Sequence, residues 1–297
     1  LHMVALTSPY AHAKIIKLDT TKCEAAPGVK GIITGDEPAR WETFPKDAVL
    51  VQNREAIWAG QIVALVAAES LEQARDAIEL IEVDYEPLPH NLNYWDSVDP
   101  DTESIVDPQF GRYGDAADRP MDEIKNRVNG NIVGQYNLLT GDVDGAMAEA
   151  DIVVERVYQT GNKTANPMET PMAVCEYASD GKITMRSNGM GIHGVVKLSL
   201  ASMLGVPENK IRVIAPVSGG SFGSRLACYM EVLSAMMALK TKRTVIYRLT
   251  REQTFITAPS NWPVVSKVKL GAKKDGTIVA LDSEISEEIG AAINNSY

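Results

Sequence analysis

Cysteine and histidine are scarce in this chain of 297 residues, and their scarcity limits the chemistry that its side chains can supply. The three cysteines, Cys23, Cys175 and Cys228, are odd in number, far apart and set among apolar residues. We therefore expect buried free thiols and no disulfide framework. The four histidines share no spacing with each other or with the cysteines that would make a zinc site. A metal ligated by protein side chains is not expected.

Positive charge is also in short supply, because 29 Lys and Arg face 39 Asp and Glu, which gives a net charge of -10. Affinity for nucleic acid depends on Lys and Arg that neutralise phosphates, and anionic membranes attract basic segments, so neither is an expected partner. The sequence has no uninterrupted apolar run of about 20 residues and no signal-peptide pattern. These absences predict a cytoplasmic protein with no membrane partner.

What the sequence does contain is typical of globular domains. Hydrophobic residues make up 45% and charged residues 23%, and the length suggests about two domains. In residues 1–95, short strand-like runs alternate with a helix, at whose start Ser70 and Gln73 have the spacing of a capping box. This alternation predicts a small α+β domain over residues 1–95.

A second domain is expected after a connector. Residues 96–138 are rich in Asp, Pro and Gly and have no sustained period, as expected of a segment that crosses a surface. In residues 139–297, hairpin turns are predicted at Asp180-Gly181 and Asp275-Gly276, with two helical segments between them. The predicted fold class is again α+β.

The most informative stretch is "RVIAPVSGGSFGSRLACYMEVLSAMMALK", residues 212–240, in which a strand-like run, a glycine turn and an apolar helix follow one another. This order is a generic place to bind an anion, since the first amides of a helix are unpaired. The phosphate-binding loop would need Gly and then Lys where this chain has Ser224 and Arg225. The dinucleotide fingerprint G-x-G-x-x-G is not matched either.

A third motif, the nucleophile elbow G-x-S-x-G of α/β-hydrolases, does match Gly219 to Gly223, with Ser221 at the nucleophile position. The triad of those enzymes runs Ser, acid, His along the chain, whereas the last histidine here is His193, upstream of Ser221. A serine hydrolase therefore stays a remote alternative. A second alternative is a structural turn that binds no ligand, although the aromatic ring of Phe222, held between two glycines, counts somewhat against it.

The turn "GGSFGSR" resembles the GGGFGGK-type turn of the molybdenum hydroxylases, the xanthine dehydrogenase and aldehyde oxidase family. The likeness covers nearly the whole chain, and it is specific through the number, order and spacing of its segments. Those similar to the α/β hammerhead domain are "SPYAHAKI" (8–15), "APGVKGIITGDE" (26–37) and "IVALVAAESLEQARDAIELIEVDYEPLP" (62–89). Those similar to the first molybdopterin-binding domain are "NPMETPMAV" around Glu169, "LGVPENKIRVIAP", "TREQTF" and "GAKKDGTIVAL".

The resemblance implies an α/β hammerhead domain followed by the first part of a molybdopterin-binding α+β domain. It implies an enzyme that hydroxylates an aldehyde or N-heterocyclic carbon with oxygen from water, and that passes electrons to iron–sulfur clusters and FAD on partner subunits or domains. The implied cofactor is molybdenum-molybdopterin, and its cytosine dinucleotide form is left open. In this family the pterin dithiolene holds the metal, which accounts for the missing His/Cys site.

The resemblance also implies the site residues. The implied cofactor-binding residues are Gly220, Ser221, Phe222, Gly223, Ser224, Arg225 and Gly191. Gly223 could bring its N–H against a molybdenum oxo group because no Cβ blocks the approach. Phe222 and Leu226 are expected to line the substrate pocket. No catalytic base is assigned within this chain.

Several positions depart from the family pattern. Gly191, two residues before His193, stands where the family usually has a glutamine beside the metal, and Leu226 stands where purine-oxidising members have glutamate. Asn261-Trp262-Pro263 replaces the frequent Arg-His-Pro. These departures leave open a non-catalytic scaffold that has lost the metal centre.

A partner is expected because family members continue through a longer second cofactor domain that carries the general base. The partner is expected to be a second molybdopterin-binding chain or a C-terminal part, together with the iron–sulfur and FAD subunits. We expect the apolar face that such a partner covers to form a large exposed patch on this chain.

Overall fold

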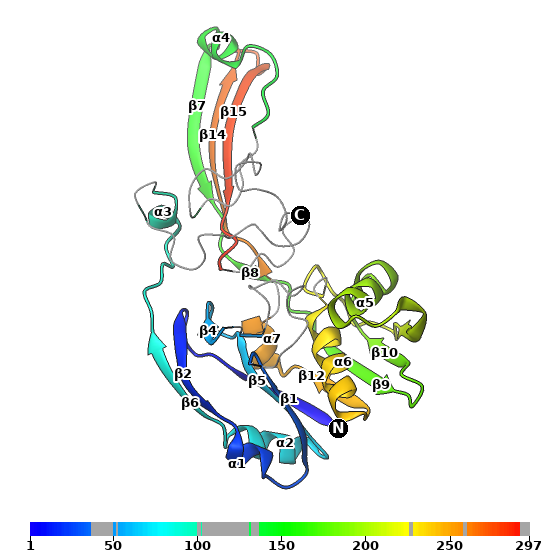
Figure 1. Cartoon of the computed structure of the whole chain (residues 1–297). Coiled ribbons are helices and arrows are strands. Elements are labelled where there is room, and N and C mark those ends of the chain that lie inside the picture. The colour runs from blue at the N-terminus through cyan, green and yellow to red at the C-terminus, as the bar shows by residue number, and fades with distance from the viewer. Residues whose placement is uncertain are drawn as a thin grey trace.

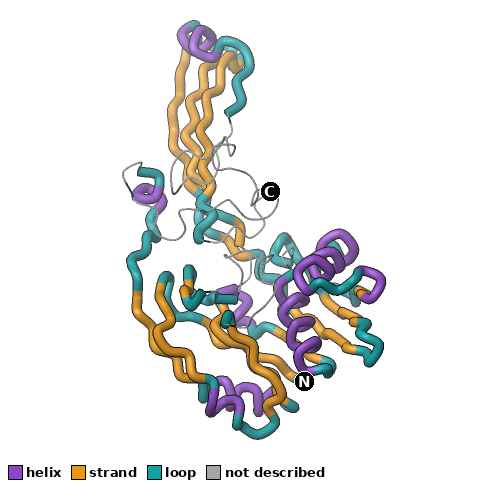
Figure 2. Tube along the Cα trace, viewed as in Figure 1, coloured by secondary structure: helices purple, strands orange, loops and turns teal. Residues whose placement is uncertain are grey.

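The computed structural model confirms the α+β class, since its described part contains helices and four β-sheets (Figures 1 and 2). The structure describes residues 1–36, 50–51, 53–99, 102, 131, 137–225, 228–257 and 260–291. Most of the predicted connector lies outside these ranges, so its boundaries stay a prediction. No helix in the described ranges is both long and apolar enough to cross a lipid bilayer.

A mixed sheet of seven strands unites the two predicted domains. Strand β1 pairs antiparallel with β5 and parallel with β12, which comes from the far end of the chain. The strands, in spatial order, are β11 (Ile211–Ile214), β10 (Ile183–Ser187), β9 (Met172–Tyr177), β12 (Val245–Arg248), β1 (His2–Thr7), β5 (Ile62–Ala68) and β3 (Val29–Thr34). The N-terminal segment is therefore built into the same sheet that carries β9 and β10.

Helices cover both faces of this sheet. Helix α6 (Tyr229–Thr241) packs against β9, β12, β10 and β3, whereas α1 (Thr21–Glu24) and α2 (Leu71–Ile78) pack against β3 and its neighbours. All seven residues of β5 are buried, and from Ala64 to Ala67 successive side chains point alternately into the core beneath α1 and α2 and the core beneath α6. This double burial explains the continuous apolar run "QIVALVAA".

The capping box predicted for α2 is present. Gln73 N donates to Ser70 Oγ at 3.2 Å, and Ser70 N donates to Gln73 Oε1 at 3.0 Å. The helix leads into β6 (Glu82–Pro87), which pairs with β2 (Ala13–Asp19) in a second sheet completed by β4 (Glu55–Ala56). The three cysteines are buried and free, as predicted.

A three-stranded antiparallel ribbon projects from the rest of the molecule and carries α4 (Val143–Ala148) at its tip (Figure 1). Its strands are β7 (Ile152–Gln159), β14 (Val264–Ala272) and β15 (Ile278–Glu287). The predicted turn at Asp275-Gly276 joins β14 to β15, and the turn at Asp180-Gly181 joins β9 to β10.

The remaining elements are short. One of the two helical segments predicted between the hairpin turns, residues 193–204, divides into a π-helix, η4 (Ile192–Lys197), and α5 (Leu198–Leu204), which ends at Gly205. The other short elements are α3 (Tyr94–Ser97), β8 (Lys163–Thr164), η5 (Glu208–Lys210), α7 (Arg251–Thr257) and β13 (Ser260–Asn261).

The predicted order of strand, glycine turn and helix is present, but the helix starts later than predicted. Helix α6 begins at Tyr229, three residues after the predicted start at Leu226. The unpaired amides of the first turn of α6 therefore belong to residues beyond the glycines. Any anion-binding capacity of the turn must come from its own backbone.

Candidate functional site

The glycine turn is held against two loops that are distant in the sequence. The three loops are residues 166–171, 187–191 and 218–225. Met190 N donates to Arg225 O at 3.2 Å, which joins the second loop to the third through the backbone. The structure thus brings together the segment around Glu169, the segment of Gly191 and the turn itself.

The side chain of Arg225 connects all three loops and is only 2% exposed. Its Nη1 donates to Glu169 Oε2 at 2.9 Å and to Asn188 O and Ser218 Oγ, each at 3.1 Å. Its Nη2 donates to the backbone oxygen of Glu169. The planar guanidinium can bond in several directions at once, which a single ammonium group cannot reproduce.

Glu169 links this arginine to the start of the turn. Gly219 N donates to Glu169 Oε2 at 2.7 Å, the same oxygen that accepts from Arg225. The Gly219 amide and then the Arg225 guanidinium hold the pKa of Glu169 below its usual value. The carboxylate is therefore ionised at neutral pH and anchors the first glycine of the turn.

The backbone of the turn enters the left-handed region three times, with φ of +103° at Gly220, +54° at Phe222 and +93° at Gly223. Glycine tolerates this conformation, whereas a large residue such as Phe222 adopts it only under strain. Phe222 is also 73% exposed. A Cβ on Gly220 would lie 2.8 Å from Phe222 Cε2, so the ring packs over a position that must be glycine.

The N–H groups of the turn are available as donors. Within the described residues, the amides of Gly220, Ser221, Phe222 and Gly223 donate no hydrogen bond. Apart from its own chain neighbours, no described residue places an atom within 4 Å of the position that a Cβ of Gly223 would take. Successive free amides in a backbone with αL residues form a concavity that accepts oxygen atoms and anions.

The predicted site residues fall into different environments. Gly220 to Gly223 form the accessible part of the turn, whereas Ser224 and Arg225 are buried beneath it, and the Ser224 hydroxyl donates to Ser221 O at 2.7 Å. Gly191 is exposed with φ of +65° directly before η4. Leu226 lies outside the described residues.

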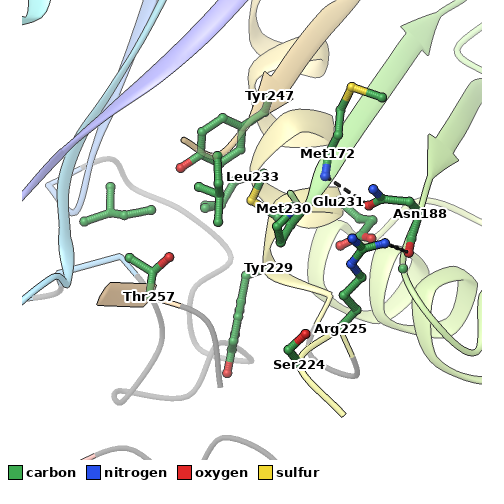
Figure 3. Close-up of a pocket in the computed structure, with 14 residues that line it drawn as sticks. Met172, Asn188, Ser224, Arg225, Tyr229, Met230, Glu231, Leu233, Tyr247 and Thr257 are labelled. Atoms are coloured by element: carbon green, nitrogen blue, oxygen red, sulfur yellow. Dashed lines mark hydrogen bonds between the residues drawn. The ribbon is translucent and has the colours of Figure 1, made fainter. Parts of the chain in front are cut away.

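A small cavity lies behind the turn, lined partly by Ser224 and Arg225. It leaves about 40 Å³ for the centre of a water-sized molecule, which is room for a few waters and not for an aromatic substrate. Figure 3 shows Arg225, Glu231 and Asn188 on one side of the cavity and Tyr247 and Thr257 on the other. Phe222, the predicted substrate contact, is not among its lining residues.

Glu231 is the buried group that sequence reasoning missed. Its carboxylate is hydrogen-bonded to Ser187 Oγ, which also accepts from Gly189 N at 2.8 Å. Burial raises the pKa of Glu231 above its usual value. The sequence did hold a signal for it, because Glu231 is the lone acid in the apolar segment "YMEVLSAMMALK". An acid on a buried helix face needs a hydrogen-bond partner, so a buried polar contact could have been predicted there.

The hydrolase alternative gains no support from the geometry. Ser221 Oγ is buried and has no hydrogen-bond partner among the described residues. A nucleophilic serine needs a base within hydrogen-bond reach. His193 is exposed on η4, and no hydrogen bond joins it to Ser221 in this part of the chain.

Comparison with known families gives the decisive observation. Residues 1–89 match the family described as "Aldehyde oxidase and xanthine dehydrogenase, a/b hammerhead domain", and residues 124–297 match "Molybdopterin cofactor-binding domain". The chain belongs to the xanthine dehydrogenase and aldehyde oxidase family. The resemblance inferred from the turn and its flanking segments is confirmed.

Individual members of this family align over almost the whole chain. "Probable hypoxanthine oxidase XdhD" of Escherichia coli (strain K12) is 30% identical over 98% of this chain and 33% of that protein. The carbon monoxide dehydrogenase large chain of Afipia carboxidovorans is 29% identical over 96% of this chain and 35% of that protein. This family member thus spans about a third of the length of these relatives.

Solved structures show the same architecture. The Cu,Mo-CO dehydrogenase in its carbon monoxide reduced state superposes on 96% of this family member with a TM-score of 0.79 and 26% identity. Quinoline 2-oxidoreductase from Pseudomonas putida 86 superposes with a TM-score of 0.76 at 24% identity, which shows the shared fold.

Proposed function

We propose that this chain forms one side of a molybdopterin site in an oxidoreductase that hydroxylates an aldehyde or an N-heterocyclic carbon with oxygen derived from water. Four consecutive amides, those of residues 220–223, carry this proposal, since they donate no hydrogen bond to any residue that the structure describes. They lie on a strained, accessible turn inside a molybdopterin-binding domain. A donor row of this kind suits a ligand rich in oxygen acceptors.

The residues of the turn fit molybdopterin, which is anionic and rich in oxygen acceptors and supplies the redox chemistry when bound. The open space beside Gly223 lets an oxygen atom approach its N–H closely, and the other amides of the turn orient further acceptors. The exposed Phe222 ring offers a flat apolar contact to a substrate. Binding and orientation are the work of this chain, and the general base is assigned to another segment or chain.

The projecting ribbon supports the proposal of a partner. Strand pairing places Ile152, Val154 and Tyr158 of β7 on the same face as Ile278, Leu281 and Ile285 of β15. These six side chains are between 42% and 64% exposed. On the opposite face, α4 covers the tip end of the ribbon, where a Cβ on Gly271 would meet Met147 at 2.9 Å.

An apolar sheet face of this size is normally covered. We infer that a further part of the molybdopterin-binding enzyme packs on it, since the relatives are about three times longer than this chain. We also infer that electrons leave through iron–sulfur clusters and FAD on partner subunits or domains. The nucleotide form of the pterin and the cytoplasmic location stay predictions.

Gly223→Ala tests the turn, and Gly276→Ala in the β14–β15 hairpin is its matched control. The two glycines have φ of +93° and +89°, and neither has an atom within 4 Å of a new Cβ. Each substitution therefore adds the same backbone strain of about 1–2 kcal/mol. We expect only Gly223→Ala to lose molybdenum and turnover in the purified enzyme.

The measurement is molybdenum per chain by elemental analysis of natively purified protein, with released pterin and the masses of co-purifying chains from the same sample. Near-stoichiometric molybdenum with additional polypeptide supports the proposal. Intact complex without molybdenum would contradict it and leave a scaffold. Full molybdenum and turnover in Gly223→Ala would exclude the turn from the site.

A further inference from the structure

We propose that Arg225 and Glu169 form a positioning pair that sets the location of the glycine turn, and that neither contacts the cofactor. This inference rests on the proposed function, because the turn matters only as a cofactor contact. Arg225 was expected to bind the cofactor itself, but its side chain is buried beneath the turn and its two Nη atoms donate to protein acceptors.

The turn has few hydrogen bonds of its own. Among the described residues 219–225, these bonds run from the amide and the hydroxyl of Ser224 to Ser221 O. The amides of residues 220–223 donate no hydrogen bond within the described residues, so these two bonds to Ser221 O are the internal bonds that hold the accessible part of the turn. Its position must therefore be imposed at its two ends.

Both ends of the turn are attached to one ion pair, that of Arg225 and Glu169. At the first end, Gly219 N donates to Glu169 Oε2 at 2.7 Å. At the second end stands Arg225, whose Nη1 donates to the same oxygen at 2.9 Å. Both ends of the turn are therefore hydrogen-bonded to the same carboxylate oxygen, Glu169 Oε2.

The same pair also holds the neighbouring loop of residues 187–191. Arg225 Nη1 also donates to Asn188 O, and the Arg225 carbonyl accepts from Met190 N at 3.2 Å. The pair therefore also fixes the distance between the turn and the segment that contains Gly191. Ligand groups held by both loops would need this spacing to stay constant, because misplacement by about 1 Å costs large factors in rate.

The chemistry of the pair explains why arginine is needed. A guanidinium presents donors in a fixed planar fork, and it remains charged at any physiological pH. Lysine would keep the charge and most of the length, but one nitrogen cannot reach Oε2 and the backbone oxygen of Glu169 together with Asn188 O and Ser218 Oγ. Arg225→Lys therefore removes the geometry of the anchor while leaving its charge.

Three variants of the whole enzyme test the inference. Arg225→Lys breaks the fork, and Glu169→Gln keeps an acceptor for Gly219 N but removes the charge. Glu169 is 36% exposed, so a substitution there disturbs the core less than one at Arg225. Glu169→Gln therefore still tests the inference if Arg225→Lys fails to fold. Arg186→Lys is the matched control, since Arg186 pairs with Glu176 at 2.8 Å on the exposed surface of β10 and β9.

The primary readout is hydrogen–deuterium exchange of peptides covering residues 216–225, which requires no cofactor. Losing hydrogen bonds to a charged group should raise exchange at Gly219 by on the order of tenfold or more, while α6 keeps its protection. Glu169→Gln should give a smaller increase, and Arg186→Lys should give none. Unchanged exchange in folded Arg225→Lys and Glu169→Gln would overturn the positioning role.

A second readout connects the pair to the site. In molybdenum-containing enzyme, the molybdenum(V) electron paramagnetic resonance spectrum of Arg225→Lys should shift, whereas that of Arg186→Lys should superimpose on wild type. A superimposable Arg225→Lys spectrum would overturn the inference while the proposed function stands. Faster exchange of the turn in Arg225→Lys, together with a natively purified wild-type complex that lacks molybdenum, would uphold the anchor and contradict the proposed function.

Discussion

A methyl group at Gly189 would test how tightly the buried acid beneath the site is held. A Cβ there would lie 2.5 Å from Glu231 Oε1 and 3.0 Å from Ser187 Oγ, whereas ordinary contact begins at 3.4 Å. The Glu231 carboxylate would have to move by about 0.9 Å. Both neighbours are buried and bonded to each other, so neither can turn into solvent.

The expected cost follows from two opposing effects. Overpacking a buried site costs about 1–3 kcal/mol, and the loss of backbone freedom in the unfolded chain returns about 0.4–1 kcal/mol. Gly189→Ala should therefore lower the free energy of unfolding by about 1–2 kcal/mol.

Urea unfolding followed by circular dichroism measures this change, with Gly194→Ala as the control. Gly194 lies in η4, and no atom stands within 4 Å of its Cβ position, so the control should be neutral or stabilising by up to about 1 kcal/mol. Equal midpoints for the two variants would refute the reasoning. Glu231→Asp should partly restore Gly189→Ala, because the shorter side chain vacates the space.

Two further predictions concern buried ionisable groups. Burial raises the pKa of Glu231, so the wild-type carboxyl stabilises the fold fully below its ordinary value near 4.5 and loses that contribution as pH rises. Urea unfolding between pH 4 and pH 8 measures the free energy of unfolding of wild type and of Glu231→Gln. Above pH 4.5, wild type should lose stability relative to the variant by up to about 1.4 kcal/mol per pH unit. A difference that stays constant with pH would contradict this. Burial also raises the pKa of Cys23 and Cys228 to about 11 and of Cys175 to about 12. We therefore expect none of the three thiols to react with Ellman's reagent at pH 8 until the protein unfolds, and prompt reaction of one equivalent in folded protein would be inconsistent with this burial.

Local features of the fold were readable from the sequence because each depends on neighbouring residues alone. The capping box of Ser70 and Gln73 needs only a spacing of three, and Asp180-Gly181 and Asp275-Gly276 supply the backbone that a hairpin turn requires. The strand-like run that forms β5 was readable as a strand, whereas its burial on both faces emerges only from the structure. These predictions are confirmed by the structure.

Features that depend on distant residues were not readable in the same way. Nothing near β1 indicates that it pairs with β12, because that choice is made by packing on α6. The helical period around residues 226–240 could not place the start of α6 at Tyr229, since apolar residues continue upstream of it. The contact of Arg225 with Glu169 joins residues 56 positions apart and depends on the whole sheet between them.

The motif "GGSFGSR" shows why a short motif identifies a site better than it assigns roles within it. Its first five residues are exposed or partly exposed and hold the strained backbone, whereas Ser224 and Arg225 are buried supports. On the proposed function both groups are needed together, because the buried residues set the position of the exposed ones. Sequence pattern records that joint requirement, but burial and hydrogen bonds are needed to separate a residue that touches a ligand from one that holds the ligand's contact in place. The separation has a practical consequence: substitution at Gly223 should change what the turn binds, and substitution at Arg225 should change where the turn lies.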